Sequence, residues 1–293
     1  MRFLLLVFLV VIGFFITCPS SRAQVDTPGL SQVVELHDGY QLLYEQKFAD
    51  ARQVFEKWAA ANPDQPFGQV SLAASYLFEE FFLQRVLTSD YFLNDKRFVG
   101  GIEGSPDHTR IDKFEAAVVK ARQLAFARLK KHPRDPEGLF ALTLCAGMQS
   151  DADSMLLKKH LDALKHLKEA NANAEILILV RPDAFDAYVA PGIANYVIGS
   201  LSSSARVMLW FGGIHGDKSL GMTDVQKTAE QGNYLKPFAK ILLALSARRE
   251  KNEELARKNL KELTEEFPGN SVYDAEYAKA MGRPIPAILV PAN

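Results

Sequence analysis

The sequence predicts an all-α protein made of about five antiparallel helix pairs. The main observation is a recurring spacing: an Ala, an apolar residue four positions later, and a Pro eight positions beyond it. The three occurrences are Ala51, Phe55 and Pro63; Ala121, Ala125 and Pro133; and Ala256, Leu260 and Pro268. Apolar residues also recur every three or four positions within 32–44 and 48–61, which is the period of amphipathic helices. Because Pro cannot continue a helix, each Pro of the spacing is expected to close a helix pair.

This spacing resembles the second helix of the tetratricopeptide repeat, a unit of about 34 residues and two helices. In that family the small residue lets two helices approach closely, and the Pro ends the unit. The resemblance implies an α-solenoid, in which helix pairs stack side by side and leave an extended groove on the concave side. We expect this TPR-like solenoid to occupy residues 32–281.

The first helix pair is expected at 32–44 and 48–61, with Ser31 as the cap of its first helix. The middle pairs are longer than one repeat. The residues that end successive pairs are Pro63, Pro133, Pro182 and Gly232, and they lie farther apart than the ~34 residues of the repeat. The middle three repeats therefore carry insertions, which in a solenoid tend to gather on one face and to shape a binding site.

Both ends of the chain are expected to lie outside the stack. A helix over 271–281 is predicted to cap it, and the Pro-rich tail 282–293 is predicted to be extended, either projecting from the protein or lying along its own surface. Residues 1–23 have the short basic start, apolar run and small-residue cleavage site of a signal peptide, with cleavage after Ala23. Lipidation at Cys18 and retention as an anchor are the alternatives. Residues 24–31 are expected to be flexible.

Two segments in the C-terminal half extend the resemblance. Residues 185–199 read FDAYVAPGIANYVIG, and residues 211–221 read FGGIHGDKSLG. Both are similar to segments of exported bacterial tetratricopeptide proteins, and a similar segment occurs in a tetratricopeptide family of the mitochondrial outer membrane. Most of the bacterial members have no assigned biochemical role. The resemblance therefore implies a fold and a place in the periplasm or cell envelope, without naming a partner.

Charge excludes one class of function. The formal net charge of −1 argues against a strongly basic surface for nucleic acid. One basic cluster stands out, formed by Lys120, Arg122, Arg128, Lys130, Lys131 and Arg134. We interpret it as the solvated outer face of the solenoid, with binding to acidic lipid headgroups as the alternative.

The sequence contains no complete catalytic motif. The six histidines are dispersed, and no metal-ligand pattern or nucleophile elbow is present. Once residues 1–23 are removed Cys145 is the one cysteine left, and its apolar neighbours indicate a small core residue. The Gly-rich stretch 212–219 lacks the spacing of a phosphate loop, so Asp217 is interpreted as a helix cap, with an anion-binding turn as the alternative.

Acidic neighbours are also interpreted as structural. The pairs Glu79–Glu80 and Asp151/Asp153 are expected to lie on solvated helix faces, because adjacent residues on a helix diverge. We therefore predict no catalytic residue, no metal site and no cofactor, and a protein that is not an enzyme.

The candidate binding surface is the groove lined by the first helix of each pair. The predicted groove residues are Leu36, Tyr40, Leu43, Phe67, Val70, Phe140, Val189, Ile193 and Tyr196, together with Ala74, Leu77, Leu144, Ile241 and Leu245. This lining is apolar and aromatic. It either grips a segment of a partner protein or is filled by the insertions, which are themselves apolar. The second insertion carries Trp210 and Phe211, which are candidates for peripheral contact with a membrane.

These observations favour an exported, non-enzymatic scaffold for protein–protein interaction in a bacterial cell envelope. The partner would be a protein or peptide, with no nucleic acid and no transmembrane span after cleavage. The alternative is a periplasmic carrier that holds a lipid or a small hydrophobic ligand in a groove closed by the insertions. A catalytic site hidden in the sequence is a third hypothesis.

Overall fold

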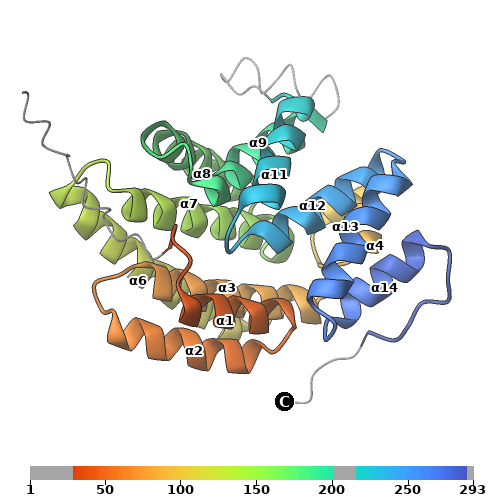
Figure 1. The fold of residues 1–293 in the computed structure, drawn as a ribbon, viewed down its shortest axis with the longest axis horizontal. Helices are drawn as coiled ribbons and strands as arrows, with labels where there is room; N and C mark the ends of the chain where they lie inside the picture. Colours follow the sequence, from red (N-terminus) through yellow and green to blue (C-terminus); the bar gives the residue numbers. More distant parts are fainter. Residues whose placement is uncertain (1–28, 201–215, 289–293) are drawn as a thin grey trace, which may run out of the picture.

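The computed structural model describes residues 29–200 and 216–288, and these residues form helices and connecting turns with no β-strand. The all-α prediction is confirmed for this part of the chain (Figure 1). The long helices are α1 (Val34–Tyr44), α2 (Phe48–Ala61), α3 (Phe67–Leu83), α6 (His108–Lys131), α7 (Pro136–Asp151), α8 (His160–Val180), α9 (Val189–Ser200), α11 (Lys218–Gln231), α12 (Lys236–Arg249), α13 (Glu253–Glu266) and α14 (Ser271–Ala280). Shorter elements are α4 (Ser89–Phe92), α5 (Asp95–Gly100), a π-helix (Ala152–Leu156) and a 3₁₀-helix (Phe185–Tyr188).

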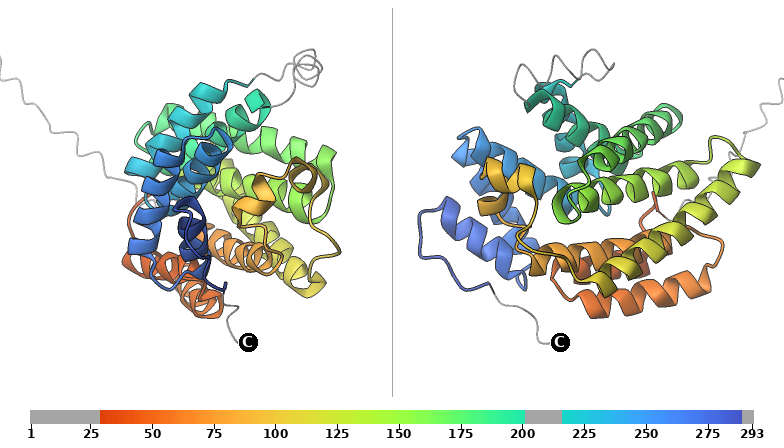
Figure 2. Two further views of the ribbon diagram at one scale, coloured as in Figure 1. Left: turned by 90° about the vertical axis from the view of Figure 1, so that its right-hand side faces the viewer. Right: turned by 180° about the vertical axis from the view of Figure 1, so that it is seen from behind.

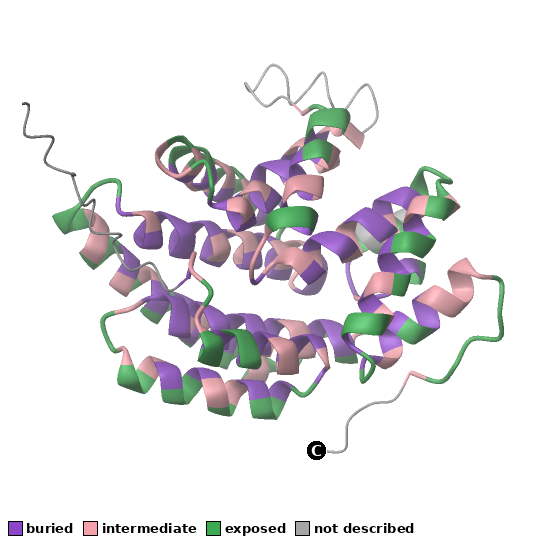
Figure 3. Cartoon of the chain, in the orientation of Figure 1, coloured by how far each residue is buried: buried purple, intermediate pink, exposed green. Residues whose placement is uncertain are grey.

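The helices pack in chain order. The five pairs in the described part are α1 with α2, α3 with α6, α7 with α8, α9 with α11, and α12 with α13, and α14 packs on α13. Consecutive pairs touch through α2–α3, α6–α7, α8–α9 and α11–α12. The first helices of neighbouring pairs also meet, as α1 with α3, α3 with α7, and α7 with α9. The helix faces that meet in this packing are buried, whereas the outward faces are exposed (Figure 3).

Small residues lie where two helices approach most closely. Ala51, Ala121 and Ala256, the first members of the recurring spacing, are each completely buried. At the crossing of α9 and α11, a β-carbon on Gly221 would lie 2.6 Å from the carbonyl oxygen of Gly192. That distance is too short for any side chain, so this crossing needs Gly. The small residues of the recurring spacing are therefore buried, and glycines occupy the α9–α11 crossing.

Asp and Asn side chains begin several helices. Asp217 accepts hydrogen bonds from the backbone N–H groups of Ser219 and Leu220, at 2.8 and 3.0 Å, which confirms it as the cap of α11. The prediction for Ser31 is wrong. Val33 occupies the N-cap position of α1 without a side-chain bond, and the carbonyl oxygen of Ser31 accepts a hydrogen bond from Tyr234.

The acidic pairs are not solvated faces. Glu80 is completely buried, forms an ion pair with Arg110, and accepts the backbone N–H of Asp107 at 3.1 Å. Glu79 pairs with Arg52 at 2.7 Å. These contacts tie α3 to α2 and α6. The prediction that Glu79 and Glu80 lie on a solvated face is therefore wrong. Their partners, Arg52 and Arg110, come from the neighbouring helices α2 and α6.

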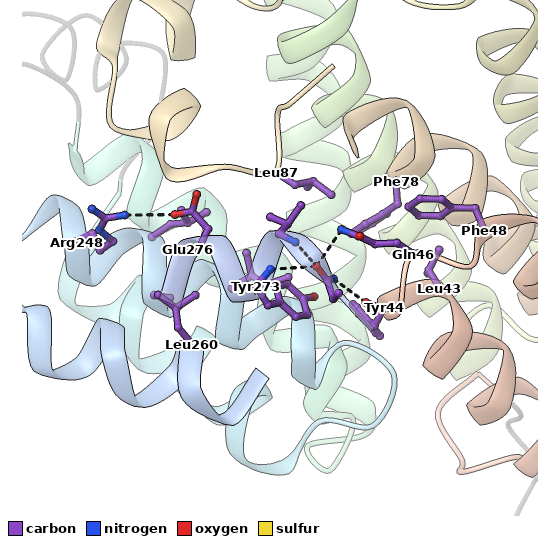
Figure 4. A pocket seen from close by; sticks show the side chains of 15 residues that line it. Leu43, Tyr44, Gln46, Phe48, Phe78, Leu87, Arg248, Leu260, Tyr273 and Glu276 are labelled. Carbon is purple, nitrogen blue, oxygen red and sulfur yellow. Dashed lines mark hydrogen bonds and ion pairs between the residues drawn. The ribbon is translucent and has the colours of Figure 1, made fainter. Parts of the chain in front are cut away.

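The stack curves until its two ends meet. The hydroxyl of Tyr44 at the end of α1 donates to the carbonyl of Tyr234, between α11 and α12, at 2.9 Å. The side chain of Asn270 donates to the carbonyl of Tyr44 at 2.7 Å and accepts from Gln46 at 2.9 Å (Figure 4). Figure 2 shows the blue C-terminal helices beside the red and orange N-terminal ones. The first pair and the last helices thus enclose the inner face.

The insertion between α3 and α6, which contains α4 and α5, also contacts the C-terminal helices. Ser89 of α4 accepts a hydrogen bond from Arg248 of α12 at 2.6 Å, and Asp90 pairs with Lys279 of α14 at 2.8 Å. Tyr91 of α4 is buried. Trp210 and Phe211 of the second insertion lie outside the described residues. Within the described ranges, no helix combines the length and apolar character needed to cross a membrane.

Candidate functional site

The predicted groove residues lie inside the protein. Eight of the fourteen expose no more than 5% of their surface each: Leu36, Tyr40, Leu43, Phe67, Val70, Leu77, Phe140 and Val189. Ile193 and Tyr196 are half-buried. Ala74 is also buried, and Leu144, Ile241 and Leu245 are half-buried. These positions therefore line the interior of the curved stack, and most of them offer no open surface to a partner.

An aromatic cluster fills the middle of this interior. The ring of Tyr234 lies 5.0 Å from that of Tyr40 and 5.1 Å from that of Phe67, and Phe67 stacks on Phe140 at 5.6 Å. The rings come from three different helix pairs and from the turn between α11 and α12. Because Tyr234 lies in an ordinary turn, the expectation that the insertions fill the groove does not account for this part of it.

Asp186 holds the turn that carries Tyr234. Its carboxylate accepts the backbone N–H groups of Asn233, Tyr234 and Leu235 at 2.7, 2.9 and 3.2 Å. The side chain is buried. Burial raises its pKa to about 6, although the three hydrogen bonds act in the opposite direction. This residue is the Asp of the FDAY segment, so a motif singled out by resemblance has a structural role here that the sequence did not reveal.

The chain's own N-terminal segment crosses the inner face. The backbone N–H of Gly29 donates to both carboxylate oxygens of Glu137 in α7, at 3.1 and 3.2 Å. The hydroxyl of Tyr234 donates to the carbonyl of Ser31 at 2.6 Å and accepts the N–H of Val33 at 3.0 Å. Figure 1 shows this segment, in red, running from α1 toward α7. Residues 29–31, expected to be flexible, are thus bonded to the stack.

A polar cleft opens beside this segment and has a volume of ≈ 470 Å³. Its rim carries amide, imidazole and charged side chains from the segment before α1, from α1, from the end of α11 through the start of α12, and from the end of α13. These residues are Gln32, His37, Gln41, Gln231, Asn233, Lys236 and Glu266. Its floor is formed by Leu30, Tyr40, Tyr44 and Phe267. The cleft thus combines an aromatic base with hydrogen-bonding walls. The sequence pointed to Tyr40 alone among these residues.

The side-chain amides of Gln41 and Asn233 differ in their hydrogen bonds within the protein. The side-chain nitrogen of Gln41 donates to Glu45 and to the carbonyl of Glu266, at 3.1 and 3.2 Å. The side-chain nitrogen of Asn233 is enclosed, yet it has no hydrogen-bond partner in the part of the chain that the structure describes. Because this nitrogen is enclosed beside the hydroxyl of Tyr234, it is less available to an incoming acceptor than the exposed amides of Gln32 and Gln231.

Two further hollows lie inside the stack. A small one of ≈ 30 Å³ lies between α1, α3, α12 and α14, where Arg248 pairs with Glu276 at 3.3 Å (Figure 4). A larger apolar cavity of ≈ 80 Å³ lies between α1, α3, α7, α8 and α9. Eight of the predicted groove residues line the larger cavity: Tyr40, Leu43, Val70, Ala74, Leu77, Leu144, Val189 and Ile193. These eight residues, expected to line an open groove, therefore border a cavity instead.

The remaining candidate groups have structural surroundings. Cys145 is completely buried, and burial raises the pKa of its thiol to about 12, which suits a core residue. The described residues place no three His, Cys, Asp or Glu side chains where they would hold a metal ion. Comparisons of this chain with family models, with curated proteins and with solved structures found no match.

Proposed function

We propose that this protein is an exported, tetratricopeptide-type solenoid that binds an extended segment of a partner protein in the polar cleft. It would act in the cell envelope as a non-enzymatic scaffold. The solenoid type is supported by five consecutive helix pairs and by contacts between the first helices of neighbouring pairs. Export rests on the signal-peptide pattern of residues 1–23.

The observation that carries the proposal is the way the inner face already holds polypeptide main chain. Gly29, Ser31 and Val33 are bound through their backbone N–H and C=O groups, and the side chains that bind them come from α7 and from the α11–α12 turn. Such contacts do not depend on the side chains of the bound segment. The same surface, continued into the cleft, is therefore suited to an extended peptide.

The chemistry of the cleft fits a peptide. A side-chain amide donates and accepts at once, as a peptide group does, so Gln and Asn can pair with main chain in either direction. The cleft offers four amides, Gln32, Gln41, Gln231 and Asn233, above an aromatic floor. The floor would receive an apolar side chain, and the amides would bind the backbone on each side of it.

Site-specific photocrosslinking tests the proposal in the cells that produce the protein. A photoreactive p-benzoylphenylalanine replaces Gln231 or His37 at the rim of the cleft. The control replaces Gln53, an exposed amide on α2 that does not line the cleft. We expect light-dependent protein adducts at the two rim positions and none at Gln53. Adducts at Gln53 alone, or at none of the three positions, would contradict the proposal.

Peripheral membrane contact through Trp210 and Phe211 is a separate proposal. It rests on the sequence of the second insertion, since both residues lie outside the described ranges. Flotation with vesicles that contain anionic lipid would test it. We expect the chain to float with the vesicles, and the double replacement of Trp210 and Phe211 by Ala to abolish flotation.

A further inference from the structure

The apolar cavity exists because one face of α7 lacks a side chain. Leu144, Gly147 and Asp151 are spaced by three and four residues, so they lie on the same face of the helix, and all three line the cavity. A β-carbon added to Gly147 would meet no heavy atom within 4 Å. The space in front of Gly147 is therefore empty, and the carboxyl of Asp151 lies one helical turn farther along.

The walls of this cavity are almost entirely apolar. They come from α3 (Leu77), α7 (Met148), α9 (Val189, Ile193) and the start of α12 (Phe238), among others. The polar side chains in the wall are satisfied within the protein. The hydroxyls of Thr143 and Ser150 donate to the carbonyls of Leu139 and Ala163, both at 2.9 Å. The Tyr40 hydroxyl accepts from Ser71, and the Tyr44 hydroxyl donates to the carbonyl of Tyr234.

Asp151 is the exception in this wall. Its carboxyl group has no hydrogen bond and no ion pair within the described residues, whereas the next acidic residue, Asp153, pairs with His166 at 3.0 Å. Protein atoms surround Asp151, yet part of its surface stays accessible, as expected for a side chain that faces a cavity. Burial alone raises the pKa of this carboxyl to about 7. The residue also adjoins the π-helix Ala152–Leu156, an irregularity that is frequent at functional sites.

We propose that this cavity is a binding site for small primary amines with an apolar body, in which the ammonium group pairs with Asp151. An ammonium group supplies both the positive charge and the hydrogen-bond donors that the carboxylate lacks. The apolar body replaces water against the cavity walls. This site shares Tyr40 and Tyr44 with the polar cleft, but Asp151 does not line the cleft, so the amine-binding and peptide-binding proposals are tested separately.

The size of the cavity sets the length of the amine. Its ≈ 80 Å³ is about half of the ~150 Å³ of an engineered cavity that binds benzene. A straight chain of about four carbons is therefore a suitable probe, and the control is 1-butanol, which has the same body and no charge.

The test is a titration of the full mature chain with n-butylamine, followed by methyl NMR of Met148, Val189 and Ile193. We expect these signals to shift, and n-butylamine to bind about tenfold more tightly than 1-butanol, since hydrogen bonds between charged groups contribute about 1.5–3 kcal/mol. Asp151→Asn should remove the preference for the amine while binding of 1-butanol persists. Equal affinities of the wild-type protein for the two probes would overturn the proposal.

Two variants at Gly147 locate the ligand. Gly147→Met places an unbranched side chain into the empty space and should abolish the methyl shifts for both probes. Gly147→Ala adds one carbon and should leave binding within about twofold, as a control for substitution at this position. Circular dichroism verifies that each variant is folded. Methyl shifts that persist unchanged in folded Gly147→Met would place the amine elsewhere and contradict the site. An absence of methyl shifts in the wild-type protein would mean that the cavity holds only water beside Asp151, and it would contradict the site as well.

Discussion

Asp186 and Asp151 differ in whether the protein supplies hydrogen bonds to a carboxylate that is removed from solvent. Asp186 is buried and accepts three backbone hydrogen bonds, so its charge fixes the turn that carries Tyr234. Asp151 faces an apolar cavity and has no partner among the described residues. Burial raises both pKa values, to about 6 and about 7. The Asp186 carboxylate therefore stabilises the fold, whereas the Asp151 carboxylate is available to a ligand.

The largest effect is expected from removing the satisfied carboxylate. Asp186→Ala leaves three buried N–H groups without an acceptor and should lower the free energy of unfolding by about 3 kcal/mol or more, because each bond to a charged group contributes about 1.5–3 kcal/mol. The control is Asp183→Ala, an exposed neighbour that should change stability by less than about 0.5 kcal/mol. Urea denaturation measures both. Equal effects would show that Asp186 does not hold the turn.

Removing the unsatisfied carboxylate should have the opposite sign. Because the folded-state pKa of Asp151 is raised to about 7, from an unfolded value of about 4, the folded protein binds the proton more tightly than the unfolded chain. The carboxyl therefore costs stability progressively as the pH rises from about 4 to about 7, and the cost is complete above that range. Asp151→Leu should raise the free energy of unfolding by about 1–3 kcal/mol at pH 8 and by much less at pH 5. A loss of stability at pH 8 would mean that Asp151 has a structural partner.

The hydroxyl of Tyr234 links the N-terminal segment to the turn. Tyr234→Phe keeps the ring in the aromatic cluster and removes the bonds to Ser31 and Val33, which should cost about 1 kcal/mol. The more specific readout is hydrogen exchange, which should become faster at residues 29–33 than in the wild-type protein. In contrast, Tyr188→Phe, which removes an exposed bond to Pro182, should leave exchange at 29–33 unchanged.

The smallest change in stability is expected from replacing a glycine by alanine, at Gly147 or at Gly282. Gly147→Ala should stabilise the protein by about 0.5–1 kcal/mol, because Gly147 lies within a helix and its β-carbon would enter empty space. Gly282→Ala should destabilise the protein, because Gly282 has a φ angle of +63°. Thermal unfolding of the two variants compares them. If Gly147→Ala is destabilising, the space in front of Gly147 is occupied.

The local part of the fold was predictable from the sequence. The predicted helices over 32–44 and 48–61 end where α1 and α2 end, and the expected helix over 271–281 corresponds to α14. These predictions depend on apolar periodicity and on Pro, which act within a few residues. The small residues of the recurring spacing, Ala51, Ala121 and Ala256, are all buried.

The closure of the stack could not be predicted in this way. The bond between Tyr44 and Tyr234 joins residues about 190 positions apart, and no local pattern encodes it. The sequence also showed no sign of the roles of three acidic residues. Asp186 and Glu80 have their partners in other parts of the chain, and the cavity that Asp151 faces is formed by several helices. Apolar periodicity indicated which residues face the interior of the stack. It did not show that this interior contains an aromatic cluster, an apolar cavity and a polar cleft.

Carbon-detected NMR of the mature chain, with and without saturating n-butylamine, measures the pKa values of Asp151 and Asp186 and so tests whether only Asp151 binds a ligand. We predict that Asp151 titrates near 7 and that n-butylamine lowers this pKa by at least one unit, because the ammonium group stabilises the carboxylate. Asp186 should titrate near 6 in both samples, since its three partners belong to the protein. If Asp151 titrates near 4 and its pKa does not change with the amine, Asp151 is not the ligand-binding carboxylate.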